Sequence, residues 1–316
     1  MIITLEDIET AHKRIAPYIH CTPVLTSKSI NEIASCEIYF KCENFQKIGA
    51  FKIRGGMNAS LSLSVDKLKK GLATHSSGNH AQAIAYAARQ LNTKAYIVMP
   101  NNSPAVKVAA VKGYGAQITF CEPTQTARES TLHKIIEDTG AEFIHPYDDD
   151  RVITGQATCA KELIEEAGPF DVMMAPVGGG GLMSGTCLGT HYLLPNAIIY
   201  AAEPEGAADA VLSIKSGKVE KAAFVKTIAD GLQTSLSEKT LGIIKTYVKE
   251  ILLISEEDIK AALKLIYERM KIVIEPSSAV TLAAVLKNKE MFAGKKIGII
   301  FTGGNVDLIK FSEWFK

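Results

Sequence analysis

Short apolar runs alternate with helical patterns along the chain, and this alternation constrains its fold more than any other feature. The runs are bounded by Gly, Pro, Asn or charged residues, as buried parallel strands are. Strands joined by helices form βαβ units, which predicts an α/β protein with two parallel-sheet domains, since a length of 316 residues favours more than one domain. The expected strands are residues 37–41, 71–75, 95–99, 117–120, 142–145, 171–176, 197–202, 250–254 and 296–301.

The charge balance and the cysteines exclude several classes of protein. Lys and Arg total 35 and Asp and Glu total 34, so the chain has no net field with which to hold nucleic acid. No apolar run approaches the roughly 18 residues of a membrane span, and Glu6, Asp7 and Glu9 do not suit a signal peptide. The six cysteines form no C-x-x-C pair, which is typical of reduced thiols. We therefore expect a cytoplasmic protein that binds neither nucleic acid nor membrane.

Loops rich in Gly, Ser, Asn or carboxylates directly follow four of the expected strands. They are residues 76–80 (Ser-Ser-Gly-Asn-His), 178–181, 203–209 and 302–305 (Thr-Gly-Gly-Asn). In parallel α/β folds, ligands bind at the carboxyl ends of the strands. We therefore expect these loops to converge on one site.

The glycine loop at residues 178–181 points to a bound phosphate. Consecutive glycines let backbone N–H groups turn toward one point, and the following helix adds the positive end of its dipole. No Gly-Lys-Ser/Thr follows, so the loop is not a P-loop, and Met183 or Ser184 stands where a dinucleotide fingerprint needs Gly. A tight turn that needs glycine only for packing is the alternative. The sequence therefore predicts a site for the phosphate of a compact cofactor.

Lys52 is the lysine with the most unusual surroundings. A lysine is ordinarily a solvated helix residue. Here Phe51 and Ile53 flank it, and Arg54 adds a second cation nearby. Apolar surroundings and a neighbouring cation both favour the neutral amine, which is the state needed for Schiff-base chemistry.

These motifs together give the chain its resemblance to a known family. Phe51-Lys52-Ile53-Arg54-Gly55, with the loops at 76–80, 178–181 and 302–305, is similar to the fold-type II pyridoxal-phosphate enzymes, which have the tryptophan synthase β-like architecture. The resemblance covers residues 5–307 and is closest to the branch of serine racemases and serine/threonine dehydratases. It implies a large domain of residues 1–70 and 149–316, a small mobile domain of residues 71–148, and a homodimer.

The resemblance also assigns roles to individual residues. Lys52 would bind the cofactor aldehyde, Asn79 would face the ring hydroxyl, and Thr302 would meet the pyridine nitrogen. The phosphate would be held by Gly178, Gly179, Gly180, Gly181 and the N–H of Leu182. The substrate would be contacted by Ser76, Asn79, His80 and Arg128.

Ser77 decides which reaction the resemblance implies. Ser is a good helix N-cap, so a capping role is the alternative for Ser77. The resemblance instead places it opposite Lys52, where it would supply the second proton donor that racemisation requires. The implied function is interconversion of L- and D-serine, with β-elimination of serine to pyruvate and ammonia as a second activity. A serine/threonine dehydratase with little racemisation is the alternative enzyme, and an inactive pyridoxal-phosphate-binding regulatory module is the alternative from another class.

The loop at residues 203–209 contains two carboxylates that can converge on a hard cation. In serine racemases the matching positions form a magnesium site, which implies Glu203, the carbonyl of Ala207 and Asp209 as ligands of Mg²⁺, Ca²⁺ or Mn²⁺. Acids that merely solvate a loop are the alternative.

Two further features bear on the substrate and on regulation. Asp148, Asp149 and Asp150 form an acidic loop, interpreted as solvated or as a hinge, which we expect to repel a second carboxylate near the substrate. Some family members bind ATP as an activator, and matching positions here are Lys47, Gln82, Tyr114, Lys271 and Asn305, although Lys28 and Ile48 depart from that pattern. A small neutral amino acid, serine or threonine, is therefore the expected substrate.

Overall fold

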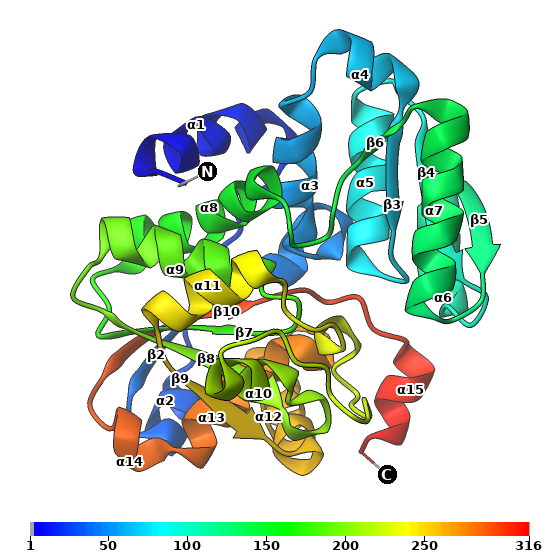
Figure 1. The fold of residues 1–316 in the computed structure, drawn as a ribbon. Coiled ribbons are helices and arrows are strands. Elements are labelled where there is room, and N and C mark those ends of the chain that lie inside the picture. The colour runs from blue at the N-terminus through cyan, green and yellow to red at the C-terminus, as the bar shows by residue number, and fades with distance from the viewer. Residues whose placement is uncertain (1–2, 316) are drawn as a thin grey trace.

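The computed structural model describes residues 3–315 and contains two β-sheets with helices on both faces of each (Figure 1). The larger sheet has the order β1-β2-β10-β7-β8-β9, and the smaller has the order β5-β4-β3-β6. Every neighbouring pair is parallel except β1 with β2. The expected α/β class with two parallel sheets is confirmed.

The larger sheet is buried on both faces because alternate residues of a strand point to opposite sides. In β7, Val172 and Met174 pack toward the core that includes α13, whereas Met173 and Ala175 pack toward the core beneath α8 and α9. Both sets are buried. The strands of this sheet are β1 (Val24–Leu25), β2 (Glu37–Cys42), β7 (Val172–Pro176), β8 (Ile198–Pro204), β9 (Val248–Ile254) and β10 (Lys296–Phe301).

The smaller sheet is formed by one continuous stretch of chain inserted between β2 and β7. Its helices lie on two sides, with α5 and α6 in one apolar core and α7 in another. The strands are β3 (Leu72–His75), β4 (Ala95–Pro100), β5 (Gln117–Cys121) and β6 (Glu142–Phe143). The chain order agrees with the expected insertion, and the division into a mobile unit at residues 71–148 stays a prediction.

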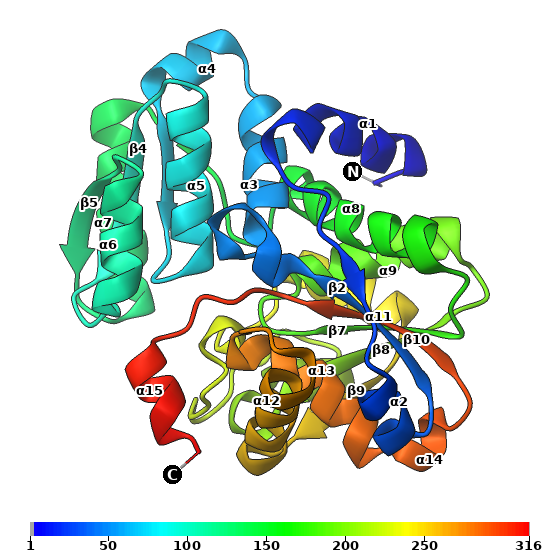
Figure 2. The same ribbon diagram turned by 180° about the vertical axis from the view of Figure 1, so that it is seen from behind.

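The helices connect successive strands and cover the sheets (Figure 2). Among the described residues, none of them is long and apolar enough to cross a membrane. The α-helices are α1 (Leu5–Ile15), α2 (Lys28–Ala34), α3 (Lys52–Leu61), α4 (Val65–Lys70), α5 (Asn79–Gln90), α6 (Ala105–Gly113), α7 (Gln125–Thr139), α8 (Asp150–Ala167), α9 (Gly181–Leu193), α10 (Asp209–Ser216), α11 (Glu238–Tyr247), α12 (Glu256–Met270), α13 (Pro276–Lys287), α14 (Lys289–Phe292) and α15 (Leu308–Glu313). Short 3₁₀ turns are η1 (Ala16–Tyr18), η2 (Glu43–Phe45), η3 (Lys47–Gly49), η4 (Glu205–Ala207) and η5 (Asp230–Leu232).

Helix α3 lies between the two sheets, with α5 on one side and α8 on the other in both views (Figure 2). Its residues Ile53, Met57 and Ala59 belong to the apolar core that also contains residues of β3, β4 and α5. The core of the smaller sheet therefore extends beyond residues 71–148 and includes the helix that begins at Lys52.

Candidate active site

A cavity of about 340 Å³ opens where the carboxyl ends of strands from both sheets meet. Three of the four loops singled out above contribute to it, following β3, β7 and β10. It is lined by every residue expected to bind the cofactor or the substrate or to act in catalysis: Lys52, Ser76, Ser77, Asn79, His80, Arg128, Gly178, Gly179, Gly180, Gly181, Leu182 and Thr302.

The fourth loop, at residues 203–209, does not line this cavity in the part of the chain that the structure describes. Glu203 still belongs to β8, which lies one strand further along the sheet than β7. Its carboxylate turns to the start of α10, where it accepts hydrogen bonds from the N–H groups of Ala210 (2.7 Å) and Val211 (3.0 Å). The expectation that all four loops form one site is therefore wrong for this loop.

Lys52 is the first residue of α3 and points its amine into the cavity, where Nζ donates to the carbonyl oxygen of Pro146 at 2.9 Å. Burial lowers the pKa of Lys52 to about 8, and the Glu275 carboxylate offsets part of that effect. A substantial neutral fraction therefore exists near neutral pH, which suits an amine that must attack a carbonyl.

The expected contribution of Arg54 to this lowered pKa is not found. Residues two apart on a helix lie on nearly opposite sides. Arg54 is directed away from the cavity, and its charge is balanced by Glu43 and Glu162. Burial, and not the neighbouring cation, therefore accounts for the lowered pKa of Lys52.

The glycine loop precedes α9 and is packed too tightly for side chains. A Cβ on Gly178 would lie 2.8 Å from the Cα of Leu232, and one on Gly179 would lie 2.3 Å from the Tyr147 ring. Gly180 has φ +87°, a conformation that favours glycine. The first N–H groups of α9 have no partner within the helix, so they can bind an anion. This cradle of N–H groups with no intervening side chain fits the phosphate of pyridoxal phosphate.

Ser77 lies in the turn between β3 and α5 and is half-buried in the cavity wall. The N-cap of α5 is Gly78, so the capping role considered for Ser77 is not observed. Within residues 3–315, its hydroxyl forms no hydrogen bond to protein, whereas the neighbouring Ser76 hydroxyl accepts the N–H of Gly78 at 3.2 Å. The Ser77 hydroxyl is therefore available to a ligand in the cavity.

His80 is neutral in this position. It is buried, and burial lowers its pKa well below the ordinary value. Its Nε2 lies 3.0 Å from the Ile144 carbonyl oxygen, so Nε2 carries the proton and donates. The backbone N–H groups of Asn79 and His80, at the first turn of α5, remain free for a carboxylate.

Glu275 is a buried carboxylate in the cavity wall that the sequence patterns do not indicate. It accepts hydrogen bonds from Asn79 Nδ2 (2.9 Å) and Thr302 Oγ1 (2.9 Å). Burial raises the pKa of Glu275. In the sequence Glu-Pro-Ser-Ser reads as an ordinary helix start, and Glu275 is indeed the N-cap of α13, so only proximity to Asn79 and Thr302 identifies it.

Two cations besides Lys52 line the cavity. Lys107 of α6 pairs with Asp230 of η5, and so links the two sheets across the opening. The Nε of Arg128 is buried and has no hydrogen-bond partner within the described residues. The acidic loop is directed elsewhere, because Asp149 caps α8 and pairs with Arg151, and Asp150 pairs with Lys239. These acids do not line the cavity as the structure describes it, so the expected repulsion of a second carboxylate is not supported.

Glu203 and Asp209 are both buried, and Asp209 Oδ2 has no hydrogen-bond partner in residues 3–315. Burial raises the pKa of Glu203 to about 8 and that of Asp209 to about 6. No cluster of three or more His, Cys, Asp or Glu side chains with metal-binding geometry occurs in the described chain. Two buried carboxylates, one with an unpartnered oxygen, nevertheless fit the donor set that a hard cation needs.

Comparisons with known proteins agree on one family. A family model described as "Pyridoxal-phosphate dependent enzyme" matches residues 15–303. The chain is 51% identical over 315 residues to the serine racemase of Dictyostelium discoideum, covering 98% of this chain and 97% of that protein. It is 50% identical over 309 residues to the beta-hydroxyaspartate dehydratase of Paracoccus denitrificans, covering 98% of each. The solved structure of maize serine racemase superposes with a TM-score of 0.96 at 41% identity, covering 100% of this chain and 97% of that one.

Proposed function

Since the chain belongs to the family of pyridoxal-phosphate-dependent enzymes, we propose a function that uses this cofactor. We propose that it interconverts L- and D-serine and also eliminates water from serine, giving pyruvate and ammonia. The observation that carries this proposal is that Lys52 and Ser77 line the same cavity. Lys52 has a lowered pKa, and the Ser77 hydroxyl has no hydrogen-bond partner among the described residues.

The residues of the cavity suit this chemistry. The N–H groups of residues 178–182 would hold the cofactor phosphate, Lys52 would bind its aldehyde, and Asn79 and Thr302 would contact its ring. When bound, pyridoxal phosphate withdraws electrons from Cα of the amino acid and so acidifies the proton there. The free N–H groups of Asn79 and His80 would hold the substrate carboxylate at the start of α5.

Two proton donors then control the outcome at Cα. Lys52 Nζ removes the α-proton of L-serine on its face, and Ser77 Oγ returns a proton from the other face, which inverts the centre. If the β-hydroxyl instead leaves as water, taking up the proton that Lys52 removed from Cα, the product is the enamine that hydrolyses to pyruvate and ammonia. Racemisation therefore needs both residues, whereas elimination from L-serine needs only Lys52.

Ser77→Ala tests this division of labour. We expect D-serine formation from L-serine to fall by roughly 10²–10⁴-fold, the usual contribution of a general acid or base, while L-serine still yields pyruvate. D-serine should become unreactive, because its α-proton faces Ser77. Chiral analysis of the products measures both. Ser76→Ala is the matched control and should affect the two isomers alike. Equal losses for both isomers in Ser77→Ala would reject the role of Ser77.

A dehydratase acting on 3-hydroxyaspartate is the second candidate function. The Paracoccus relative is named beta-hydroxyaspartate dehydratase, and a Saccharomyces cerevisiae relative is named L-threo-3-hydroxyaspartate ammonia-lyase. The unpartnered Nε of Arg128 could receive a second carboxylate. Comparison of kcat/KM for L-serine, L-threonine and the 3-hydroxyaspartates decides between the candidates, and Arg128→Gln should lower only the value for dicarboxylates. Pyruvate without any D-serine in the wild type would leave a serine/threonine dehydratase.

We further propose that a divalent cation, Mg²⁺ or Ca²⁺, binds at Glu203, Asp209 and the Ala207 carbonyl, supported by the buried carboxylates there. The enzyme would act as a homodimer in the cytoplasm, in line with its reduced cysteines. Activation by ATP stays a prediction of the resemblance. Melting temperatures with EDTA or Mg²⁺ test the cation site, and light scattering tests the homodimer. Turnover of serine with and without ATP tests the activation.

A further inference from the structure

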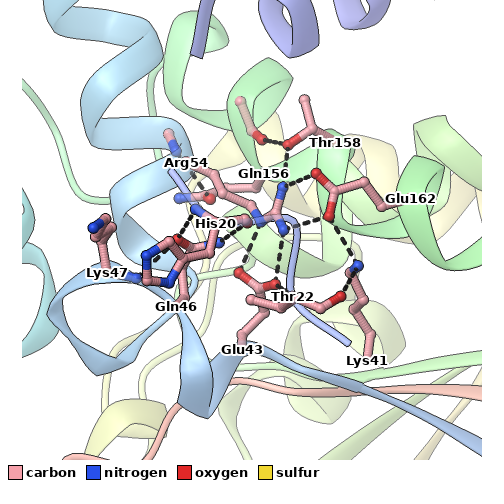
Figure 3. A network of polar contacts seen from close by, with 12 residues as sticks. His20, Thr22, Lys41, Glu43, Gln46, Lys47, Arg54, Gln156, Thr158 and Glu162 are labelled. Carbon is pink, nitrogen blue, oxygen red and sulfur yellow. Dashed lines mark hydrogen bonds and ion pairs between the residues drawn. The ribbon is translucent and has the colours of Figure 1, made fainter. Parts of the chain in front are cut away.

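Four charged side chains, none of which lines the cavity, are buried together beside the start of α3 (Figure 3). Arg54, Lys41 and Glu43 have no exposed surface, and Glu162 is 5% exposed. Two cations and two carboxylates balance one another. We call these residues the Arg54 cluster.

Arg54 uses all of its hydrogen-bond donors, four of them to Glu43 and Glu162 of this cluster and one to Thr158. Its Nε and Nη2 donate to the two oxygens of Glu43 at 2.7 and 2.8 Å, and its Nη1 and Nη2 donate to the two oxygens of Glu162 at 2.7 Å each. The remaining Nη1 proton is directed to Thr158 Oγ1 at 3.2 Å. A planar guanidinium held by two bidentate carboxylates has one orientation only. The cluster therefore fixes the rotation of α3 at Arg54.

The partners of Arg54 all belong to the larger sheet and the helix that covers it. Glu43 lies in η2, directly after β2, and Glu162 lies in α8. Glu162 is anchored a second time by Lys41 of β2, whose Nζ is 2.9 Å away and also donates to the Thr22 carbonyl at 2.6 Å. The apolar side of α3, in contrast, packs into the core of the smaller sheet. Helix α3 is thus ion-paired to one sheet and packed against the other.

The glycine loop and Lys52 must keep a fixed separation if one cofactor is to span them. The loop follows β7 of the larger sheet, whereas Lys52 begins the helix that packs with the smaller sheet. Apolar packing is not directional and would let α3 follow the smaller sheet. Single hydrogen bonds resist this at Phe51, whose N–H donates to the Thr302 carbonyl at 2.9 Å, and at Gly55, whose N–H donates to Gln156 Oε1 at 3.1 Å. Arg54, two residues after Lys52, adds the charged and bidentate contacts.

We propose that Arg54 is a positioning residue: through Glu43 and Glu162 it locks the first turn of α3, and with it Lys52, to the larger sheet that carries the glycine loop. The proposal rests on the role proposed above for Lys52. Stability alone does not explain the cluster, because well-packed apolar residues often replace a buried ion pair at no cost.

The test uses the enzyme depleted of and then reloaded with pyridoxal phosphate. The rate at which the amine of Lys52 binds the cofactor is followed by the visible absorbance as a function of pH. In the wild type the midpoint should lie near the pKa of Lys52, about 8. Arg54→Lys keeps the charge but loses the bidentate hydrogen bonds to Glu43 and Glu162, so Lys52 should leave its desolvated position. We expect the midpoint to rise by about one pH unit or more toward the ordinary lysine value, and kcat to fall by roughly 10²-fold with a smaller change in KM.

Lys41→Met is the matched control. It removes a buried cation from the same cluster but leaves every hydrogen bond of Arg54 in place. It should lower the melting temperature and leave the midpoint unchanged. If Arg54→Lys and Lys41→Met lose stability and both keep the wild-type midpoint, the cluster is only structural and the proposal is rejected.

Glu43→Gln decides the question if Arg54→Lys yields no folded protein, because it keeps the arginine and weakens only its bidentate hydrogen bonds to residue 43. A raised midpoint supports the proposal, and an unchanged one rejects it. Failure of the proposed function is distinguishable from failure here, since the titration needs no substrate. If Lys52 is not the cofactor lysine, Lys52→Ala will still bind the cofactor covalently whatever happens at Arg54.

Discussion

Lys41 is fully buried in β2, and Lys52 is half-buried in the cavity wall at the start of α3. Burial by itself lowers the pKa of Lys41, but the Glu162 carboxylate at 2.9 Å outweighs burial and the pKa is raised. Lys52 has only a carbonyl as its hydrogen-bond partner, so burial prevails and its pKa falls to about 8. Burial therefore lowers the pKa of both lysines, and the presence of a nearby carboxylate decides whether the amine keeps its positive charge.

The same contrast holds for two carboxylates. Burial would raise the pKa of Glu162, but His12, Arg54 and Lys41 together hold it well below the usual range. Glu203 is also buried and accepts only two backbone N–H groups, so its pKa rises to about 8. Among the described residues, the charges around Arg54 thus neutralise each other, whereas Lys52 and Glu203 lack an ion-pair partner and remain available, to a cofactor and to a cation respectively.

The largest expected effect comes from removing the unpaired lysine. Lys52→Ala should lower turnover of serine on the order of 10⁴-fold or more and abolish covalent cofactor binding, because the other amine in the cavity wall, that of Lys107, is paired with Asp230. Borohydride reduction followed by peptide mapping of the wild type identifies the labelled lysine. A label on any other lysine would contradict the assignment.

Breaking the paired region should affect stability first. Glu162→Gln leaves Lys41 buried with its main ion-pair partner removed, and it weakens the bidentate contact of Arg54 with residue 162. We expect the free energy of unfolding to fall by ~3–5 kcal/mol, the usual cost of breaking a buried pair on one side. Chemical denaturation measures this change. A loss below ~1 kcal/mol would show that the cluster tolerates an unpaired cation.

Glu203 and Asp209 should make the cation-free protein sensitive to pH. Their folded pKa values, about 8 and about 6, lie above those of the unfolded chain, so the folded state binds protons more tightly. Without a divalent cation, their contribution to stability should therefore be largest below about pH 4 and be lost as the pH rises through 6 and 8. Mg²⁺ should remove this loss by stabilising the ionised carboxylates.

Melting temperatures between pH 5 and 8.5, with EDTA or with Mg²⁺, measure this effect. The double variant Glu203→Gln and Asp209→Asn is the control and should show neither the pH dependence nor the response to Mg²⁺. An equal response to Mg²⁺ in the wild type and the double variant would place the cation elsewhere.

The smallest effect is expected where charges are paired but exposed. Lys69 lies 3.1 Å from Asp66, and both side chains are more than two-thirds exposed, at 71% and 88%. Water screens such a pair, so Lys69→Ala should change the free energy of unfolding by no more than about 0.5 kcal/mol. A loss similar to that of Glu162→Gln would mean that burial does not separate the two kinds of pair.

Local patterns were sufficient to predict most of the strands and the loops of the cavity. Strand β7 is an apolar run because it is buried on both faces, and the glycines after it follow from tight packing against Tyr147 and Leu232. Strand β1 was missed because Val24–Leu25 is a two-residue edge strand with no periodicity to detect. The loops after β7 and β10 converge because parallel strands of one sheet end at one edge, but the loop after β8, at residues 203–209, does not join them. The loop after β3 belongs to the other sheet, so only the packing of the two sheets brings it to the cavity.

What the sequence by itself determined is the α/β class, the family and the residues of the cavity, because these depend on periodicity and on motifs contiguous in the chain. The tertiary structure alone decided the charge states. Glu43, Arg54 and Glu162 come together from η2, α3 and α8, and Glu275 meets Asn79 across the cavity. A charged residue in a sequence carries no record of its partners. Its pKa depends on burial and on groups a few ångströms away, and only the folded chain brings those groups to it.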